Sequence, residues 1–556
     1  MTEATPAGTG PTAAPATHST PFPVVEHLRQ VLLWPLRLMQ PAGAAERSAR
    51  PWEALLQTPG SPWREVVDEY TGGSEGFHER HYNEFVTFLP YVQRFLYGEG
   101  RAAARGDAAA GSPVRVLRRD DVAQARVVLR QGDAPLLLDI VHVDLYFFLD
   151  VDVVFLNVEV RIDGLPLPLA QELLYRFGRG YPSGWDDQGH ALHCLASAEW
   201  LDAGGRVLAA SDAQRRDVFL AHVCAHRAPR IAAHWAYLLR PLVSDHSEGD
   251  GALRFRQIEY YRMPTMAYLA VDAPRALTRA DFTRLGLIAG VEGPDPGLPD
   301  FEQHFCYDRF WCDGGAAPRT RYLCSGHSLV VVGDARAGFF ACRDRGVLAQ
   351  FRHQHFMLFL IAHFQKASLL MFSDRLAEAL RRLDVSSPAS VRQFKRVIRA
   401  SFEGFLRFTH RYWFHEIAEQ AQARALFKLC TTHLGTDALY AEVKERIAEM
   451  NGYLEADSLR RQANTVVRLT VVTIFGLVGT VTTGFLGMNL LAEADAPWPR
   501  KLAIFGVTFA VTSLLTLYTM VKSKRLSDLL DALSDEQLGV WQKAKAFAGI
   551  WGRKSG

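Results

Sequence analysis

The sequence predicts a mixed α+β (α/β) domain, followed by a long helical stalk and two membrane-spanning helices near the C-terminal end. Runs rich in Val, Ile, Leu and Phe, typical of strands, follow one another between residues 114 and 162. No proline interrupts residues 389–496, which favours long helices. Two stretches, 469–486 and 502–521, contain no charged residue. Each is long enough to cross a bilayer core of about 30 Å as a helix.

Composition places most of the chain in an ordinary folded body. Of the 556 residues, 48% are hydrophobic and 22% are charged, as in globular proteins. The net charge of +2 argues against a nucleic-acid partner. The seven cysteines have no paired spacing, which indicates a reducing compartment rather than a disulfide scaffold. The chain has no GxxxxGK[ST] phosphate-binding loop, and we expect neither an enzyme nor an organic cofactor.

The N-terminal part is expected to be a tail over residues 1–22, rich in Ala, Thr, Pro and Gly, and a cytoplasmic α/β domain over residues 23–345. Residues 23–97 are interpreted as mainly helical, and the Gly- and Ala-rich residues 98–113 as a loop. Further helices are predicted at 167–177 and at 213–239, the latter broken at Pro229. Strands are predicted at 114–117, 125–129, 136–149, 151–162, 321–332 and 337–342.

A helical region including a stalk helix is expected over residues 346–465. The pattern predicts helices at 348–383 and 391–434, the second with Ser390 as a possible N-cap. A third helix, 437–486, runs without a breaker into the first apolar stretch, and about 50 residues at 1.5 Å each make a rod on the order of 75 Å. Such a rod is either a pore-lining element or a coiled-coil stalk that carries a simple membrane anchor.

The membrane part is expected to be a hairpin with both ends in the cytoplasm. The spans are assigned to 466–488 and 502–521, and the outer loop 489–501 is too short to hold a domain. Basic residues precede the first span and follow the second, as the positive-inside rule requires for cytoplasmic ends. The tail 522–556 starts as a basic, amphipathic helix. We therefore expect a multi-pass protein of the cell (inner) membrane.

The first span is unusually rich in small and hydroxyl-bearing residues. Around a symmetric axis its face would give polar rings separated by apolar constrictions, which gate by dewetting. The alternative is a small-residue helix interface. Since two spans cannot enclose a pore, a channel requires a homo-oligomer. Counted back from Asn489, the face contains Gly484, Thr480, Leu477, Thr473, Leu469 and Val466.

The exit of the first span carries oxygen donors suited to a hard cation. Mg²⁺ prefers oxygen ligands and gives up its waters reluctantly, so a ring of Asn489 carbonyls would hold the hydrated ion. Glu493 and Asp495 in the loop would raise the local cation concentration. The membrane potential favours inward movement of a divalent ion by about 4.6 kcal/mol per 100 mV, twice the single-charge value.

Gly487-Met488-Asn489, at the end of the first of two C-terminal spans, resembles the signature of CorA-type divalent metal ion transporters. The resemblance implies a funnel-shaped homopentamer in which the stalk and the first span line the pore. It implies that Gly487, Met488 and Asn489 form the ion-selecting ring. By position, it places Thr480 and Leu477 in the middle of the pore, Leu469 and Val466 at the cytoplasmic gate, and Asn464 at the inner polar ring, one residue short of the family spacing. The chain departs from the family where Leu486 replaces the usual aromatic and where LLAEADAPWPRK replaces the usual acidic loop.

These observations lead to one expected function and two alternatives. We expect a homopentamer in the lipid bilayer that takes up Mg²⁺, driven by the membrane potential and gated by cytoplasmic Mg²⁺. One alternative is Zn²⁺, Co²⁺ or Ni²⁺ transport by the same kind of protein. The other is a membrane-anchored regulatory or binding protein without transport.

Three other groups of polar residues receive structural interpretations. One set has spacing that fits no standard zinc site: His304, Cys306, Cys312, Cys324 and His327. The histidines of the 213–239 segment lack an HExxH pattern and are read as packing or surface residues: His222, His226 and His234. The acidic residues of the strand pair are read as solvated strand ends, with Mg²⁺ sensing as the alternative that the resemblance suggests: Asp144, Asp150 and Asp152.

Overall fold

The computed structural model describes residues 22–39, 50–66, 79–98, 112–247, 249, 251, 253–259, 262–294, 297–384, 387–487 and 497–534. The chain divides into two compact units, Met1–Ala448 and Glu449–Gly556. The first unit is a mixed α/β body, as expected, and contains the sheet and most of the helices.

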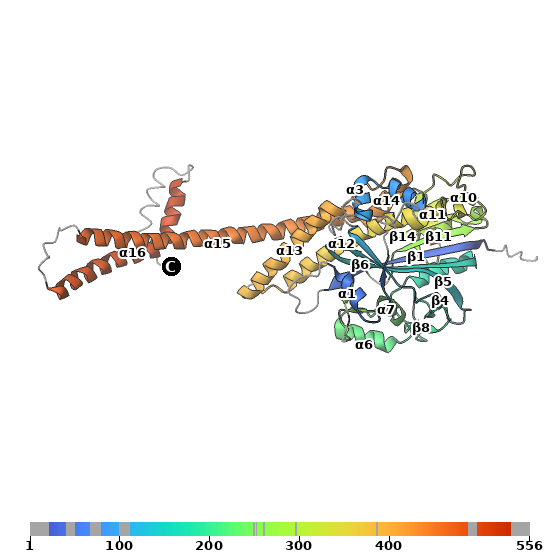
Figure 1. The fold of residues 1–556 in the computed structure, drawn as a ribbon, viewed down its shortest axis with the longest axis horizontal. Helices are drawn as coiled ribbons and strands as arrows, with labels where there is room; N and C mark the ends of the chain where they lie inside the picture. Colours follow the sequence, from blue (N-terminus) through green and yellow to red (C-terminus); the bar gives the residue numbers. More distant parts are fainter. Residues whose placement is uncertain are drawn as a thin grey trace, which may run out of the picture. The chain divides into compact units, whose positions relative to one another are not determined.

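One large sheet organises the first unit (Figure 1). Its main path runs β12-β13-β14-β11-β1-β6-β5-β4-β7-β8, and the pairings are antiparallel except for β11 with β14 and β10 with β9. The longest strands lie at its centre: β1 (Val24–Met39), β5 (Leu136–Phe148) and β6 (Val151–Pro166). The remaining strands are β2 (Arg64–Glu65), β3 (Val114–Arg118), β4 (Gln124–Val128), β7 (Ser197–Leu201), β8 (Val207–Ala210), β9 (Leu242–Ser244), β10 (Leu253–Gln257), β11 (Thr265–Val271), β12 (Cys306–Tyr307), β13 (Arg321–Cys324) and β14 (Ser328–Asp334).

The helical interpretation of residues 23–97 is wrong for β1. This segment pairs with β6 along its whole length, and with β11 up to the Leu32–Thr265 pair. On the side of β1 that faces β11, the pairing partner from Leu36 onward is β10. Pro35, which lacks an N–H donor, falls in the gap between the two partners, where no ladder bond is required of it. The helical prediction is also wrong for β2 (Arg64–Glu65), and it holds for α1 (Pro51–Gln57), α2 (Glu79–Thr87) and α3 (Pro90–Tyr97).

The other local predictions mostly agree with the structure. The four strands predicted between residues 114 and 162 are β3 to β6, and the helix 167–177 is α5 (Leu167–Phe177). The 213–239 segment is broken, as expected, into α6 (Arg216–His226) and α7 (Ala233–Leu239). Residues 321–332 form two strands, β13 and β14, rather than one. The strand predicted at 337–342 is wrong, because α10 (Gly338–Ala341) turns there and places the Phe340 ring on Tyr268, with centroids 4.6 Å apart.

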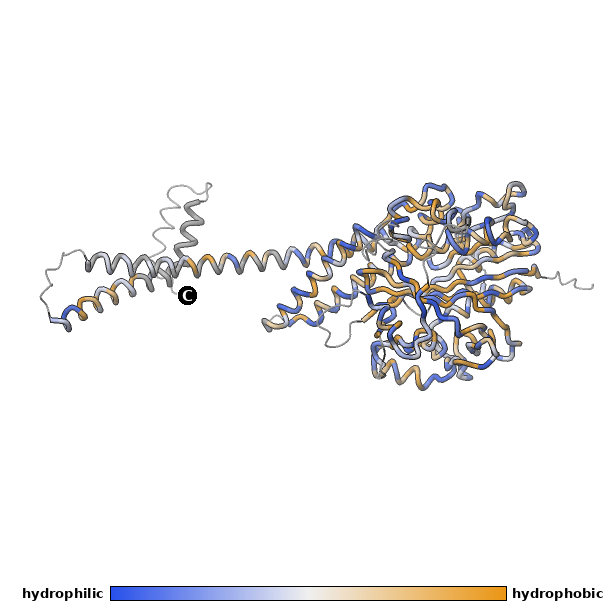
Figure 2. Tube along the Cα trace, in the orientation of Figure 1, coloured by the Kyte–Doolittle hydropathy of each residue, from blue (hydrophilic) through white to orange (hydrophobic). Residues whose placement is uncertain are grey.

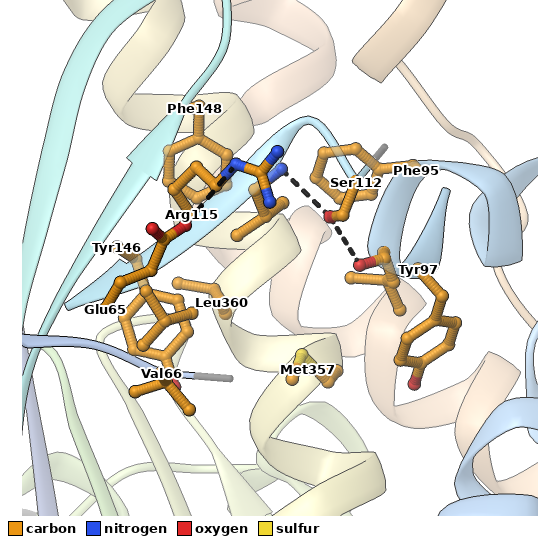
Figure 3. A pocket seen from close by; sticks show the side chains of 13 residues that line it. Glu65, Val66, Phe95, Tyr97, Ser112, Arg115, Tyr146, Phe148, Met357 and Leu360 are labelled. Atoms are coloured by element: carbon orange, nitrogen blue, oxygen red, sulfur yellow. Dashed lines mark hydrogen bonds and ion pairs between the residues drawn. The ribbon is translucent and has the colours of Figure 1, made fainter. Parts of the chain in front are cut away.

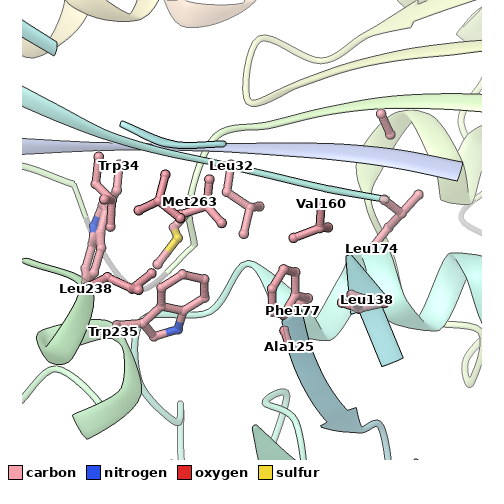
Figure 4. Close-up of a cluster of buried hydrophobic side chains, with 14 of the residues drawn as sticks. Leu32, Trp34, Ala125, Leu138, Val160, Leu174, Phe177, Trp235, Leu238 and Met263 are labelled. Atoms are coloured by element: carbon pink, nitrogen blue, oxygen red, sulfur yellow. The ribbon is translucent and has the colours of Figure 1, made fainter. Parts of the chain in front are cut away.

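Both faces of the sheet are buried. On one face Leu32 and Val160 pack against Phe177 of α5 and Trp235 of α7 (Figure 4). On the other face α12 (Phe356–Arg381) crosses β1 and β6, and Phe364 stacks on Phe148 with centroids 3.8 Å apart. Burial on both sides explains the apolar runs within the central strands, such as Val153–Leu156 of β6. Residues of α8 (Arg279–Leu287) and α9 (Phe301–Phe305) belong to the same core cluster as Phe177 and Trp235, and η3 (Pro274–Ala276) precedes α8.

The helix predicted at 348–383 is confirmed, with a local irregularity. It consists of α11 (Val347–Gln350), a π-helical turn η4 (Phe351–His355) and α12. Among the described residues this segment, Val347–Arg381, is the one helix found to be long and apolar enough to cross a membrane. Since 78% of its apolar stretch is buried in the protein, we interpret it as a core helix.

The single helix predicted at 391–434 is wrong, because two helices occupy it: α13 (Pro388–Tyr412) and α14 (Ala421–Leu434). The chain leaves the helix between them to bury Ile417 and Ala418, and Ala418 makes a β-bridge with Phe88. The N-cap is Ser387, whose side chain accepts a hydrogen bond from the backbone N–H of Ser390.

The long helix predicted at 437–486 is confirmed as α15 (Thr436–Gly487), and the boundary between the two units falls within it. The second apolar stretch lies in α16 (Trp498–Ser534), which continues through the residues expected to form an amphipathic tail. Apolar residues recur along the described part of α16 (Figure 2). Large apolar side chains there, such as Leu502, Val507 and Leu514, are exposed. In both expected spans the structure describes only some of the side chains, and those at positions 477 and 516 are among the ones it does not describe.

Candidate functional site

Helix α15 aligns most of the predicted pore-lining positions. At 100° per residue, Val466, Leu469, Thr473, Thr480 and Gly484 fall within an arc of about 60° on a regular helix. The positions of Leu477 and Gly487 widen this arc only to about 80°. We refer to this arc as the aligned face of α15.

Not every predicted site residue belongs to the aligned face. Because α15 is continuous, position 464 lies about 160° around the helix from position 466, so Asn464 does not share the face. Gly487 is the last residue of α15. Met488, Asn489, Glu493 and Asp495 lie outside the described residues, and their predicted roles stay predictions.

The threonine hydroxyls of the aligned face donate to their own helix. Thr473 Oγ1 donates to the Leu469 carbonyl oxygen at 2.9 Å, and Thr480 Oγ1 to that of Gly476 at 2.9 Å. Each hydroxyl proton is thereby satisfied without a second helix, while the oxygen lone pairs remain able to accept. The water shell of a cation points its hydrogens outward, so such oxygens suit a hydrated cation.

The N-terminal end of the aligned face is apolar. Val466 is 61% exposed and Leu469 is 67% exposed within one chain. Two large aliphatic side chains one turn apart are of the kind that form an apolar constriction, and such constrictions gate pores by dewetting.

The described histidine and cysteine residues of the first unit form no metal-binding group. No group of three or more His, Cys, Asp or Glu side chains suited to a metal ion occurs among the described residues. Cys312 is exposed and Cys324 is buried, which separates two members of the 304–327 set. His222 and His226 lie beside His246 on the surface of α6, with the rings of His226 and His246 5.2 Å apart. His234 is buried elsewhere, against Trp200 and Trp235.

The three aspartates of the β5–β6 region are ion-paired. Asp144 accepts from Arg118 at 2.7 and 3.0 Å. Asp150 pairs with Arg411 at 3.0 Å, and Asp152 with Arg375 at 2.7 Å. Because Asp144 and Asp152 are buried, the interpretation of these residues as solvated strand ends is wrong for both. A Mg²⁺ ion would have to displace an arginine from each carboxylate.

Sequence reasoning missed a buried ionic cluster on the helical face of the sheet. Glu159 of β6 pairs with Arg29 of β1 at 2.6 Å and with Arg352 of η4 at 3.2 Å. His142 of β5 lies 3.9 Å from the same carboxylate. Burial would raise the pKa of Glu159, but the charges of Arg352 and Arg29 outweigh it and hold that pKa below its ordinary value. The sequence signal that could have indicated this cluster is the presence of three charged residues in segments otherwise rich in apolar residues.

A small cavity lies between β3, α3 and α12 (Figure 3). Its volume is about 140 Å³, and Phe95, Phe148 and Leu360 contribute its apolar wall. Arg115 lies 3.9 Å from Glu65 at its edge. The volume is well below that of a typical organic-ligand site, which is about 300–1,000 Å³.

No protein-family model matches this chain, and no curated protein matches it either. The resemblance to CorA-type transporters therefore rests on the residues that carry it.

Proposed function

We propose that this protein is an oligomeric membrane channel for hydrated divalent cations, with Mg²⁺ as the principal ion. The observation that carries the proposal is the continuity of α15 from Thr436 to Gly487, which brings the aligned face to the Gly-Met-Asn tripeptide without a break. If the helix ended before residue 466, the positions 466–484 would no longer share one face that leads to the tripeptide. The homopentameric state and the location in the cell membrane are part of the proposal.

The exposed apolar surface of the second unit supports a membrane location. Val507, Val511 and Leu514 of α16 are each more than half exposed, as is Leu469 of α15. Exposure of such apolar helices to water is unfavourable, whereas lipid or neighbouring copies of the chain would cover them. The hydroxyls of Thr508 and Thr512 donate to carbonyls of their own helix, which lowers the cost of placing them in lipid.

The chemistry of the aligned face supports a hydrated ion rather than a dehydrated one. Thr473 and Thr480 offer hydroxyl oxygens, and Asn489 offers an amide oxygen. None of these groups is charged, so none would bind a divalent ion tightly enough to trap it. The membrane potential supplies the driving force for uptake. Cytoplasmic Mg²⁺ would close the pore at the Val466–Leu469 constriction.

Ion flux into liposomes tests the proposal. Purified full-length protein is reconstituted with an entrapped Mg²⁺-sensitive dye, and a potential, negative inside, is applied. We expect uptake that Asn489→Ala reduces at least about tenfold, with Thr508→Val of α16 as the matched control that retains it. No flux in the native protein, or equal flux in Asn489→Ala, would overturn the proposal.

Two further measurements separate the alternatives. A Zn²⁺-sensitive dye in the same liposomes distinguishes Mg²⁺ transport from Zn²⁺, Co²⁺ or Ni²⁺ transport, for which the same oxygen-lined face is less suited than nitrogen or sulfur ligands. The mass of the protein in detergent distinguishes a pore from a membrane-anchored regulatory protein. A monomer or dimer would contradict the pore, because two spans per chain cannot enclose one.

A further inference from the structure

A large cavity in the first unit lies between the end of β1, α12 and α13. Its volume is about 750 Å³, which is within the range of small-molecule sites and far above that of the packing voids in protein interiors. Two kinds of surface meet in it. One part of the wall is apolar, formed by Leu38, Met39, Phe394 and Val397. The other part carries guanidinium groups.

Four arginines line the cavity, against two carboxylates, Asp245 and Glu378. Glu378 is the point on which the arginines converge, and its side chain is only 12% exposed. Arg37 Nη2 lies 3.2 Å from Glu378 Oε2, and Arg382 Nη2 lies 2.7 Å from Oε1. Arg256 Nη1 lies 3.7 Å from the same Oε1. One carboxylate thus faces three guanidinium groups.

Arg375 is the fourth arginine of the cavity, and further carboxylates pair with the four arginines. Arg375 pairs with the buried Asp152 at 2.7 Å, Arg256 also pairs with Asp245 at 2.7 Å, and Arg37 Nη1 also pairs with Asp374. Each guanidinium carries five N–H donors, more than one shared carboxylate can accept. The Nε of Arg37 is buried and has no hydrogen-bond partner among the described residues. Donor capacity therefore exceeds the acceptors at this wall.

Helix α13, which forms one side of the cavity, adds positive charge around it. Arg392, Arg396 and Arg399 are exposed on this helix, and Glu403 is its one acidic residue. A concave site inside such a positive field attracts anions. Arginine forks match phosphate oxygens bidentately, while the apolar wall fits a planar ring system.

We propose that this cavity binds a nucleoside polyphosphate, with the phosphates on Arg256 and Arg382 and the base against Phe394 and Val397. The volume, the excess of guanidinium donors and the apolar wall together favour this class over a lone phosphate, which would leave most of the cavity empty. The site lies entirely within the first unit. Binding there is a property separate from ion transport, and its test requires no flux.

Calorimetric titration of the purified full-length chain in detergent, without Mg²⁺, tests the site with ATP, pyrophosphate and adenosine as probes. We expect saturable binding of ATP, weaker binding of pyrophosphate and weakest binding of adenosine. Arg256→Gln removes a guanidinium, and Ala400→Trp, at an exposed position of α13 that lines the cavity, fills the space without altering its charge. Each should weaken ATP binding about tenfold or more, equal to about 1.4 kcal/mol.

Arg407→Gln is the matched control, because Arg407 also lies on α13 but faces Asp150 outside the cavity. It should leave ATP affinity unchanged. Thermal unfolding of each variant verifies that the fold is intact, and the exposed Arg382→Gln is the replacement if Arg256→Gln unfolds. Absence of saturable ATP binding in the millimolar range, or equal affinity in all variants, would overturn the proposal. Binding of pyrophosphate alone, or of phosphatidylglycerol vesicles alone, would also overturn it.

Discussion

Arg29 Nη1 lies 2.6 Å from Glu159 Oε1 in the middle of the sheet, and the two side chains are only 5% and 7% exposed. The pair joins neighbouring central strands, β1 and β6. Arg352 reaches the same carboxylate from the π-helical turn η4, so the cluster also ties the sheet to the helix that covers it. A buried ion pair contributes little net free energy against an apolar replacement, but removing one partner leaves the other charge stranded.

Glu159→Gln should therefore lower the free energy of unfolding strongly, by about 3–5 kcal/mol, because the buried guanidinium group of Arg29 and the half-buried one of Arg352 lose their anion. Urea unfolding followed by tryptophan fluorescence measures the change. Glu302→Gln is the matched control, since Glu302 and Arg279 form an exposed pair whose loss should cost less than about 1 kcal/mol. Equal effects of the two substitutions would contradict the role assigned to burial.

Acidification should destabilise the first unit from about pH 6.5 downward, partly through His234. Burial lowers the pKa of His234 to about 3, against the opposing pull of Asp212. Between pH 6.5 and 3 the unfolded chain binds a proton at this histidine that the folded chain does not, so the free energy of unfolding falls as the pH falls. His234→Leu should flatten the pH dependence of stability in this window. The exposed His410→Leu should leave it unchanged, and an unaltered slope in His234→Leu would contradict the prediction.

Gly333 of β14 has no room for a side chain. A Cβ atom there would lie 2.2 Å from a ring carbon of Phe340, which α10 folds back onto the sheet. Gly333→Ala should lower the unfolding temperature and cost about 1–3 kcal/mol, because the aromatic ring must move. Gly338→Ala, at the start of α10, meets no atom within 4 Å and should change stability by less than about 0.5 kcal/mol. Thermal unfolding of the two variants side by side provides the comparison.

A polar substitution at the proposed constriction should open it. Leu469→Ser would wet the apolar end of the aligned face, so Mg²⁺ uptake in liposomes should persist at internal Mg²⁺ concentrations that close the native channel. Val507→Ser of α16 removes an equally exposed aliphatic side chain outside the proposed pore and should leave closure unchanged. If Leu469→Ser closes like the native protein, the gate lies elsewhere on the helix.

How far sequence reasoning reaches depends on the range of the interactions. The strands β5 and β6 and the helix α5 are correctly predicted because the spacing of apolar residues along each segment is a local signal. The segment 391–434 looks like one helix because nothing in its local pattern reveals the burial of Ile417 and Ala418. The arginine-lined cavity draws on β1, β10, α12 and α13, and no spacing in the chain relates those residues.

The sequence by itself determined the continuity of α15, because helical periodicity without proline or another breaker specifies a helix from neighbouring residues alone. The positions of the aligned face follow from that continuity. Only the tertiary structure decided that Val24–Met39 is a strand, since its pairing with β6 and β11 involves residues more than 110 positions away. The same long-range pairing placed Pro35 in the gap between β11 and β10 and brought Arg29 to Glu159. Local propensity is overridden there because burial on both faces and strand pairing along both edges stabilise the strand more than a solitary helix would.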